Sequence, residues 1–468
     1  MPGKLFALPA LLLLLGVAGC NSDKSDFVHK TEQELAGMEL QNQQANAAFR
    51  NSDYESAGKI LMQLSSEMTV SRPQYQMELL SVLLLEGKHD EAHQLMMKLH
   101  QDIEALFDVK LEEKAQSLWH GEVNKVYKGD AYERSTFYAL LALSFIRQEN
   151  YADALRSVKN GLLAEADANN QKSIDDYGLL HYLGYVACSR MNDTAAADEF
   201  LRAMYNGLEP RGFELEDPNG NRNIDHCFEQ LKKSDHNVFL VIWTGAPPEV
   251  VCTGQYKEKR SIVRGRNAFD MMTIAVSSSP PVTIPNNLGD LNYQATTRGG
   301  RLMDDVLADQ AAAKTAMNVG GNVFMIAGSA LVIAGARSMG APPVGVSLLG
   351  AGVGCWVVGG GCYVVGSLMN PAADPRFWRN IPCQFYIVPL RLEPGQHQIM
   401  LTGYNHFDVV GASYYNIHVP ADQKNQVIHL SMMQPETTAQ NVRSSKILVE
   451  LESVLDKAEQ NRMQKEIK

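Results

Sequence analysis

Cys20 is the residue whose chemistry is most narrowly defined by its neighbours. It follows Val17-Ala18-Gly19 at the end of a leucine-rich stretch, residues 5–17, and Lys4 supplies a short positive segment before that stretch. An apolar stretch of this length is typical of a secretory signal peptide and is too short to span a bilayer comfortably. Small residues before a cysteine fit the bacterial lipoprotein signal peptidase, after which the sulfur accepts diacylglycerol. We therefore expect a signal peptide over residues 1–19 and a lipid anchor on Cys20.

The residues after the anchor and the overall charge indicate where such a protein resides. Asn21 stands where an aspartate would favour retention in the inner membrane, so the outer membrane is expected, with the chain facing the periplasm. The formal net charge is −11 and becomes −12 without Lys4, which argues against nucleic acid as a partner. The six other cysteines lack zinc-site spacing, so disulfides and free thiols both remain open.

Two groups of residues have spacings that could hold a metal ion. His89, His93 and His100 could share one face of a helix, although a solvated polar face is the alternative. Residues 217–225 alternate oxygen-bearing side chains in the manner of a calcium loop. The glycine and the bidentate glutamate of an EF-hand are replaced by Arg222 and Phe228, which favours a plain asparagine-rich turn. We expect no resident metal.

Signatures of enzymes were sought along the whole chain. It contains no GxSxG, HExxH, P-loop or SxxK-type arrangement. Its glycine-rich pieces lack the strand, helix and acidic residue of a dinucleotide site. The sequence therefore predicts a protein that is not an enzyme and needs no cofactor.

Arg376, Trp378 and Arg379 form the best candidate for a recognition patch. Arginine and tryptophan are over-represented among the residues that dominate binding at protein interfaces. The alternative is a structural corner, in which Trp378 covers the core of a β-domain. Both interpretations remain open at the level of the sequence.

The elements that would position these residues begin with helices. Over residues 20–210 apolar residues recur at helical spacing, and four segments repeat a polar turn followed by an alanine. These alanines are Ala57, Ala92, Ala154 and Ala196. A small residue there lets paired helices approach, as in tetratricopeptide (TPR) repeats. We expect a TPR-like helical array whose concave face binds a protein partner, with a generic helical bundle as the alternative.

A β-domain is predicted after a turn-rich linker over residues 211–236. Short runs of strand-forming residues fall in two groups, 237–300 and 372–435, and favour one antiparallel β-sandwich. Residues 436–468 place apolar side chains on one helix face and predict an amphipathic C-terminal helix. The fold class expected is therefore α+β with several domains.

The two groups of strands are separated by an apolar, glycine-rich insert, residues 301–371. Between residues 318 and 368 the only charge is Arg337, and Pro342-Pro343 divides the stretch into two arms, each long enough to span a bilayer. Glycines on one helix face permit close packing in lipid or between chains, and the candidates are Gly321, Gly328, Gly335, Gly350 and Gly354. Burial of the hairpin inside the fold is the alternative.

Several of these stretches together resemble an uncharacterised family of bacterial outer-membrane lipoproteins. They are residues 129–162, 181–204, 237–248, 280–285 and 373–399. The family joins TPR-like helices to a β-domain with the signature Asp-x-Arg-x-Trp-x-x-Leu-Pro. It appears here as Asp374, Arg376, Trp378 and Ile381-Pro382. The resemblance implies architecture, location and a role in envelope maintenance, but no chemistry; the glycine-rich insert departs from the family.

Two functions are consistent with these expectations. The first is a protein-binding scaffold for cell-envelope assembly or maintenance, anchored through acylated Cys20. The alternative is a homo-oligomeric, membrane-active or pore-forming assembly in which the glycine-rich hairpins of several chains associate.

Overall fold

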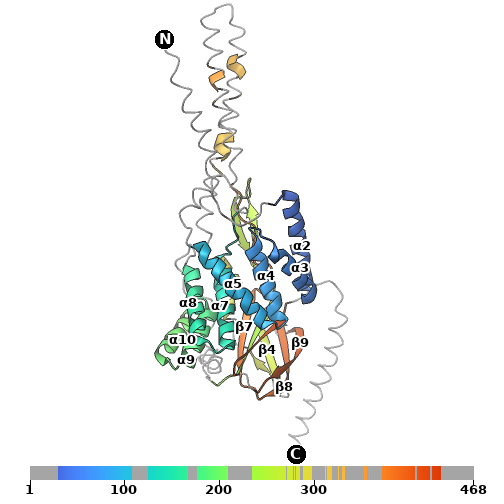
Figure 1. Cartoon of the computed structure of the whole chain (residues 1–468), viewed down its shortest axis with the longest axis vertical. Helices are drawn as coiled ribbons and strands as arrows, with labels where there is room; N and C mark the ends of the chain where they lie inside the picture. Colours follow the sequence, from blue (N-terminus) through green and yellow to red (C-terminus); the bar gives the residue numbers. More distant parts are fainter. Residues whose placement is uncertain are drawn as a thin grey trace, which may run out of the picture.

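Helices come first in the chain and strands follow, so the protein belongs to the α+β class, as predicted (Figure 1). The computed structural model describes residues 30–107, 125–166, 176–208 and 235–433, the last range with gaps that leave only fragments between 298 and 370. The anchor Cys20, most of the linker and the C-terminal helix expected over residues 436–468 lie outside the described residues.

Eight α-helices form four consecutive packed pairs. They are α2 (Glu32–Arg50) with α3 (Tyr54–Ser66), α4 (Arg72–Leu85) with α5 (His89–Phe107), α7 (Ala131–Arg147) with α8 (Tyr151–Ala166), and α9 (Gly178–Arg190) with α10 (Thr194–Leu208). The first helices of the later pairs, α4, α7 and α9, are buried along almost their whole length. The second helices of the pairs, such as α3 and α5, are amphipathic and turn polar faces outward.

The turns inside the four pairs have the same backbone geometry. Each turn contains one residue with a positive φ, namely Ser52, Gly87, Glu149 and Asn192. Five residues after each of these, a buried alanine donates its backbone N–H to the carbonyl four residues before it; these alanines are Ala57, Ala92, Ala154 and Ala197. The alanine predicted to lie between the paired helices is the buried one in the first three pairs. In the fourth pair the prediction was wrong by one residue, because Ala196 is only half-buried and Ala197 is buried.

Two four-stranded sheets and a two-stranded ribbon follow the helices. The first sheet has the order β10 (Gln426–Met432), β1 (Val238–Thr244), β7 (Gln384–Leu390) and β6 (Gly289–Asp290). The second has the order β5 (Val282–Thr283), β4 (Met271–Val276), β8 (Gly395–Asn405) and β9 (Asp408–Val419). The ribbon pairs β2 (Glu249–Thr253) with β3 (Lys259–Val263). The first sheet is mixed, because β1 and β10 run parallel, so the expectation of purely antiparallel pairing was wrong.

Strand β1 lies at the centre of the molecule and explains its layers. All seven of its residues are buried. Phe239, Val241 and Trp243 face a core shared with the helices, whereas Val238, Leu240 and Ile242 face the core between the two sheets. The layers are therefore helices, the mixed sheet and the antiparallel sheet. The short helix α12 (Leu291–Thr297) also belongs to the core on the helical side.

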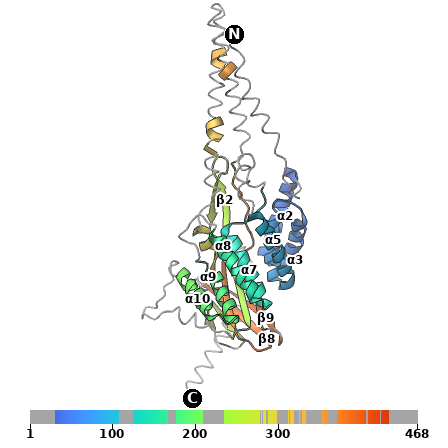
Figure 2. The ribbon, with the colours of Figure 1, turned by 60° about the vertical axis from the view of Figure 1, so that its left-hand side comes forward.

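The ribbon marks one end of the molecule. In Figures 1 and 2 it extends beyond the helices and the sheets, and the described fragments of the insert continue in the same direction. Of the described residues between 314 and 358, none is buried. Within the described part of the chain, no helix is both long and apolar enough to cross a bilayer.

Candidate functional site

Residues 374–380, here called the signature segment, run between the insert and β7 without forming a helix or a strand. Asp374 and Arg376 are each 5% exposed, and Trp378 is completely buried. Trp378 belongs to the core that joins the helices to the mixed sheet. The residues expected to form a corner or a recognition patch therefore lie inside the molecule, with the exception of the half-buried Arg379.

Arg376 joins three separate parts of the chain. Its Nε and Nη2 donate to the two carboxylate oxygens of Asp374 over 2.8 and 2.9 Å. Its Nη1 also donates to the carbonyl of Val70 before α4, and its Nη2 to the carbonyl of Lys125 before α7, over 3.2 and 2.8 Å. A guanidinium presents its donors in a fixed planar fork, which suits this combination of a bidentate carboxylate and backbone carbonyls.

The backbone around Trp378 is held by side chains of the helices. Its N–H donates to Oε1 of Glu133 on α7 over 2.6 Å, and its indole N–H lies 3.0 Å from Oγ of Ser81 on α4. Gln74 on α4 donates to the carbonyl of Phe377 over 3.1 Å. The signature segment thus occupies the surface between α4 and α7 in the way that a bound peptide would. This surface between α4 and α7 is therefore filled by the chain itself.

Glu133 and Asp130 extend this network toward the ribbon. Glu133 accepts hydrogen bonds from the hydroxyl of Tyr127 and from the backbone of Asp130, over 2.7 and 2.6 Å. Burial, and then the charge of Asp130, raise the pKa of Glu133. Arg260 on β3 forms a buried ion pair with Asp130 and donates to the carbonyl of Asp374. Helices, signature segment and ribbon are therefore joined by buried charged side chains, which bind either an opposite charge or a backbone group.

Arg379 points to a different part of the helical array. It forms an ion pair with Glu39 on α2 over 2.8 Å, and its guanidinium lies 5.7 Å from the ring of Phe377. All four residues singled out in this segment, Asp374, Arg376, Trp378 and Arg379, therefore make contacts within the chain.

Glu78 is the second fully buried carboxylate beside the signature segment. Asn46 and Gln74 donate to its carboxylate over 3.0 Å each, and Asn380 donates to its backbone carbonyl over 2.8 Å. Burial raises the pKa of Glu78 from 4.5 to about 7, although the nearby guanidinium of Arg379 acts in the opposite direction.

This raised pKa predicts a pH dependence of stability. Between pH 4.5 and about 7, the unfolded chain has lost the Glu78 proton that the folded chain retains, so the free energy of unfolding falls as the pH rises. The Glu78 contribution should fall by about 2–3 kcal/mol between pH 5 and pH 8. Glu78→Gln should remove this part of the slope in urea unfolding, whereas Glu91→Gln on the exposed surface of α5 should keep it. Identical slopes for Glu78→Gln and the native protein would contradict the assignment.

The borders of the insert meet at the tip of the ribbon, residues 254–258. On one side, the ammonium of Lys314 lies 4.7 Å from the ring centroid of Tyr256. On the other, the backbone N–H of Ala373 donates to the carbonyl of Lys257 over 3.1 Å. The insert therefore leaves the folded part of the molecule and returns to it at one place.

Of the glycines predicted to pack in a membrane or an oligomer, Gly354 alone lies among the described residues. A Cβ atom built on Gly354 would meet nothing within 4 Å. Close packing on Gly354 therefore requires lipid, a second chain or residues outside the described part. Gly321, Gly328, Gly335 and Gly350 lie outside the described residues.

The three histidines of α5 are half-buried and contact side chains of other elements. Nδ1 of His93 lies 2.9 Å from the hydroxyl of Ser144, and the His89 ring lies 5.8 Å from the buried ring of His429. Burial lowers the pKa of His89 to about 4, so the ring is neutral at pH 7. The described residues contain no group of three or more potential ligands that could hold a metal ion. The candidate calcium turn, residues 217–225, lies outside the described residues.

Sequence reasoning missed the buried partners of the signature segment: Glu78, Asp130, Glu133 and Arg260. The available signal was a charge within an apolar helix, as in "MELLSVLLL" around Glu78 and "AYERSTFYALLAL" around Glu133. A charged residue is rarely buried unless it is paired, so such a position indicates a partner elsewhere in the chain.

The thiols of Cys188, Cys355 and Cys383 are free, and burial raises the pKa of Cys383 to about 12.

Comparison with protein-family models, with curated proteins and with solved structures finds no match to this chain.

Proposed function

We propose that the protein is a lipoprotein of the bacterial outer membrane, anchored through acylated Cys20 and facing the periplasm, whose folded part is a protein-binding scaffold for the cell envelope. The glycine-rich insert is a second contact with the same membrane. The resemblance to envelope lipoproteins with TPR-like helices agrees with this role.

The observation that carries the proposal is that the N-terminal tether and the insert leave the folded part at the same end. Lys30 forms an ion pair with Glu67 over 2.8 Å. Val70 follows Glu67 by three residues, and its carbonyl accepts a hydrogen bond from Arg376. The same guanidinium donates a hydrogen bond to Asp374. The insert ends directly before this pair. Cys20 is ten residues before Lys30, so an extended tether reaches about 35 Å. One membrane surface can therefore receive both the acyl chains and the insert.

The four equivalent helical turns support a TPR-like array, and the two stacked sheets support a sandwich-like β-domain. Because the signature segment fills the surface between α4 and α7, a partner would bind outer surfaces of the array. The first helical pair offers exposed apolar side chains there, with Leu40 57% and Met62 55% exposed. Exposed apolar side chains on neighbouring helices favour a protein partner over a small molecule.

Two experiments test the proposal. Cys20→Ser should abolish labelling by radioactive palmitate and leave an unprocessed precursor, because the sulfur is the lipid acceptor. Labelling that persists in Cys20→Ser would exclude the lipoprotein assignment. Photo-crosslinkers at Leu40 and at Met62 should capture the same envelope protein in intact cells, and one at Val282 on the antiparallel sheet should not. Capture at none of the three positions would remove the support for a scaffold.

The alternative is an oligomeric, membrane-active assembly, and it is supported by Gly354, whose Cβ position has no described residue within 4 Å. Its test uses cysteines at Val353 and Val358, which are 57% and 51% exposed, in a chain whose native Cys355 and Cys362 are replaced by serine. In an assembly through the insert, these cysteines should form disulfides between chains in the membrane. Monomers alone at both positions would favour the scaffold.

A further inference from the structure

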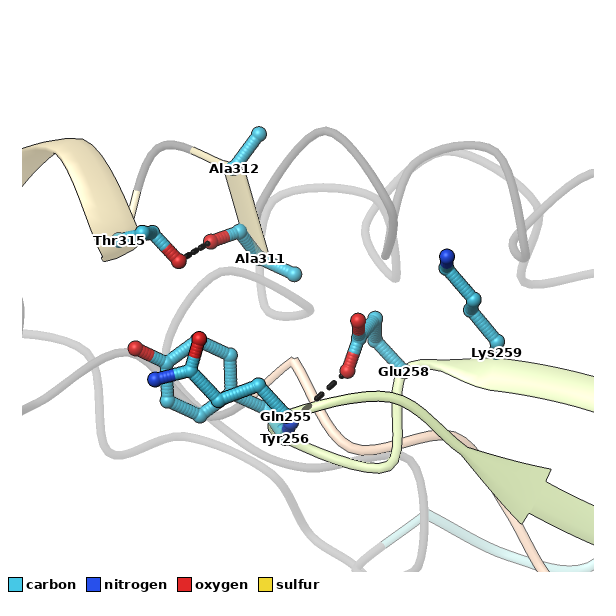
Figure 3. A pocket seen from close by; sticks show the side chains of 7 residues that line it. All are labelled: Gln255, Tyr256, Glu258, Lys259, Ala311, Ala312 and Thr315. Carbon is cyan, nitrogen blue, oxygen red and sulfur yellow. Dashed lines mark hydrogen bonds between the residues drawn. The ribbon is translucent and has the colours of Figure 1, made fainter.

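A small cavity of about 220 Å³ lies at the base of the insert. One side is formed at the ribbon tip by Gln255, Tyr256, Glu258 and Lys259. The other side is formed by the helical fragments that contain Ala311, Ala312 and Thr315 (Figure 3). Drug-sized ligands usually occupy about 300–1,000 Å³, so this cavity suits a smaller polar group. It lies at the end of the molecule where the tether and the insert emerge.

One part of the lining is suited to a cation. Glu258 is only 7% exposed, and its Oε2 accepts the backbone N–H of Tyr256 over 2.8 Å. Beside it, the Tyr256 ring already attracts the ammonium of Lys314. Because Lys314 takes up this ring, the buried carboxylate of Glu258 is the group that can bind the ammonium of a ligand, through a charge-assisted hydrogen bond.

Gly254 keeps the carboxylate in this position. Its φ is +99°, and a Cβ there would lie 2.3 Å from Oε1 of Glu258. A side chain at residue 254 would therefore displace the carboxylate that lines the cavity.

A positive charge lies at the edge of the cavity, on Lys259. Lys259 is exposed, lines the cavity and forms no ion pair with a residue that the structure describes. Its ammonium is a strong partner for a phosphate. The lining thus offers a buried acceptor for an ammonium group and an exposed donor for an anion.

We propose that this cavity binds a phosphoethanolamine group, with its ammonium on Glu258 and its phosphate on Lys259. The primary ammonium donates hydrogen bonds to the carboxylate, which the trimethylated ammonium of choline cannot do. The ligand is the headgroup of phosphatidylethanolamine, an assignment that rests on the proposed orientation toward a membrane. Soluble glycerophosphoethanolamine carries the same ammonium and phosphate groups, so it is the second possible source of the ligand.

The first experiment uses the purified, lipidated full chain in detergent and titrates it with glycerophosphoethanolamine by calorimetry. Glu258→Gln and Lys259→Gln should each weaken binding about 10-fold or more, because each removes one charge-assisted contact. Glu249→Gln, the same change on the exposed part of β2, should leave binding unchanged, and glycerophosphocholine should bind about 10-fold more weakly. Because Lys259 is exposed, its variant should fold normally and remains informative if Glu258→Gln does not fold.

The second experiment separates the two sources. The same chain is placed in nanodiscs of phosphatidylethanolamine with phosphatidylglycerol, or of phosphatidylglycerol alone, and lipids that stay bound after extraction are identified by native mass spectrometry. Retention of phosphatidylethanolamine that depends on Lys259 supports the headgroup. Binding of the soluble compound without such retention overturns the lipid source, and binding insensitive to both variants overturns the site. The titration needs no membrane, so it still reports on the cavity if the proposed membrane orientation is wrong.

Discussion

Arg376→Met is expected to lower the free energy of unfolding by about 3–5 kcal/mol, because it leaves the carboxylate of Asp374 buried without its partner. Asp374 is 5% exposed and receives two hydrogen bonds from the guanidinium. The substitution also removes the donors that hold the carbonyls of Val70 and Lys125. Urea unfolding measures the loss.

Two further variants identify the cause of this loss. Arg156→Met removes a surface ion pair whose arginine side chain is 71% exposed, and it should cost no more than about 1 kcal/mol. The double variant Asp374→Ala/Arg376→Met should be less destabilised than the sum of its single variants, because no unpaired charge remains. A loss below about 1 kcal/mol for Arg376→Met alone would show that the pair does not join the helices to the signature segment.

Trp378→Ala is expected to cost about 3–5 kcal/mol and to separate the unfolding of helices from that of sheets. The indole is completely buried in the core that both parts share, and its removal leaves a large cavity there. The readouts are helical circular dichroism and the tryptophan fluorescence of chains in which Trp119 and Trp356 are replaced by phenylalanine, so that Trp243 on β1 is the remaining tryptophan of the variant. In the native protein the two signals should change at one urea concentration, and in Trp378→Ala at two.

Trp378→Phe separates the contribution of the ring from that of its N–H group. It keeps most of the apolar volume but loses the donor to Ser81 and Asn380, so it should cost about 1–3 kcal/mol. Phe377→Ala, at the half-buried neighbour, should cost less than Trp378→Ala. Coincident unfolding in all three variants, with losses below about 1 kcal/mol, would contradict the role given to the signature segment.

Local patterns predicted the elements well, because their signals lie in neighbouring residues. The apolar run "VFLVIWT" is typical of a buried strand, and β1 is buried, in fact on both of its faces. The repeated turn and alanine indicated the helical pairs, with an error of one residue at Ala196 because three alanines follow one another there. The parallel pairing of β1 with β10 carries no local signal, since more than 180 residues separate the two strands.

The candidate site was predicted only in part, for the same physical reason. The types and spacing of Asp374, Arg376 and Trp378 marked the segment as important, but recognition and internal packing remained equally consistent with the sequence. The partners that decide between them, Glu133 and Ser81, lie more than 240 residues away. A hydrogen bond over such a separation depends on the packing of whole elements, and no pattern within a short window records it.

The central claim is that the insert contacts the membrane that also holds the lipid anchor. The most direct test replaces residues 1–20 with a cleavable secretory signal peptide, so that the exported chain carries no acyl group, and compares this protein with one that also lacks residues 318–369. We predict that the first stays with urea-washed outer membranes. The second should be released in soluble form with an unchanged melting temperature, since both borders of the insert meet at the ribbon tip. Complete release of the first protein, or misfolding of the second, would contradict the claim.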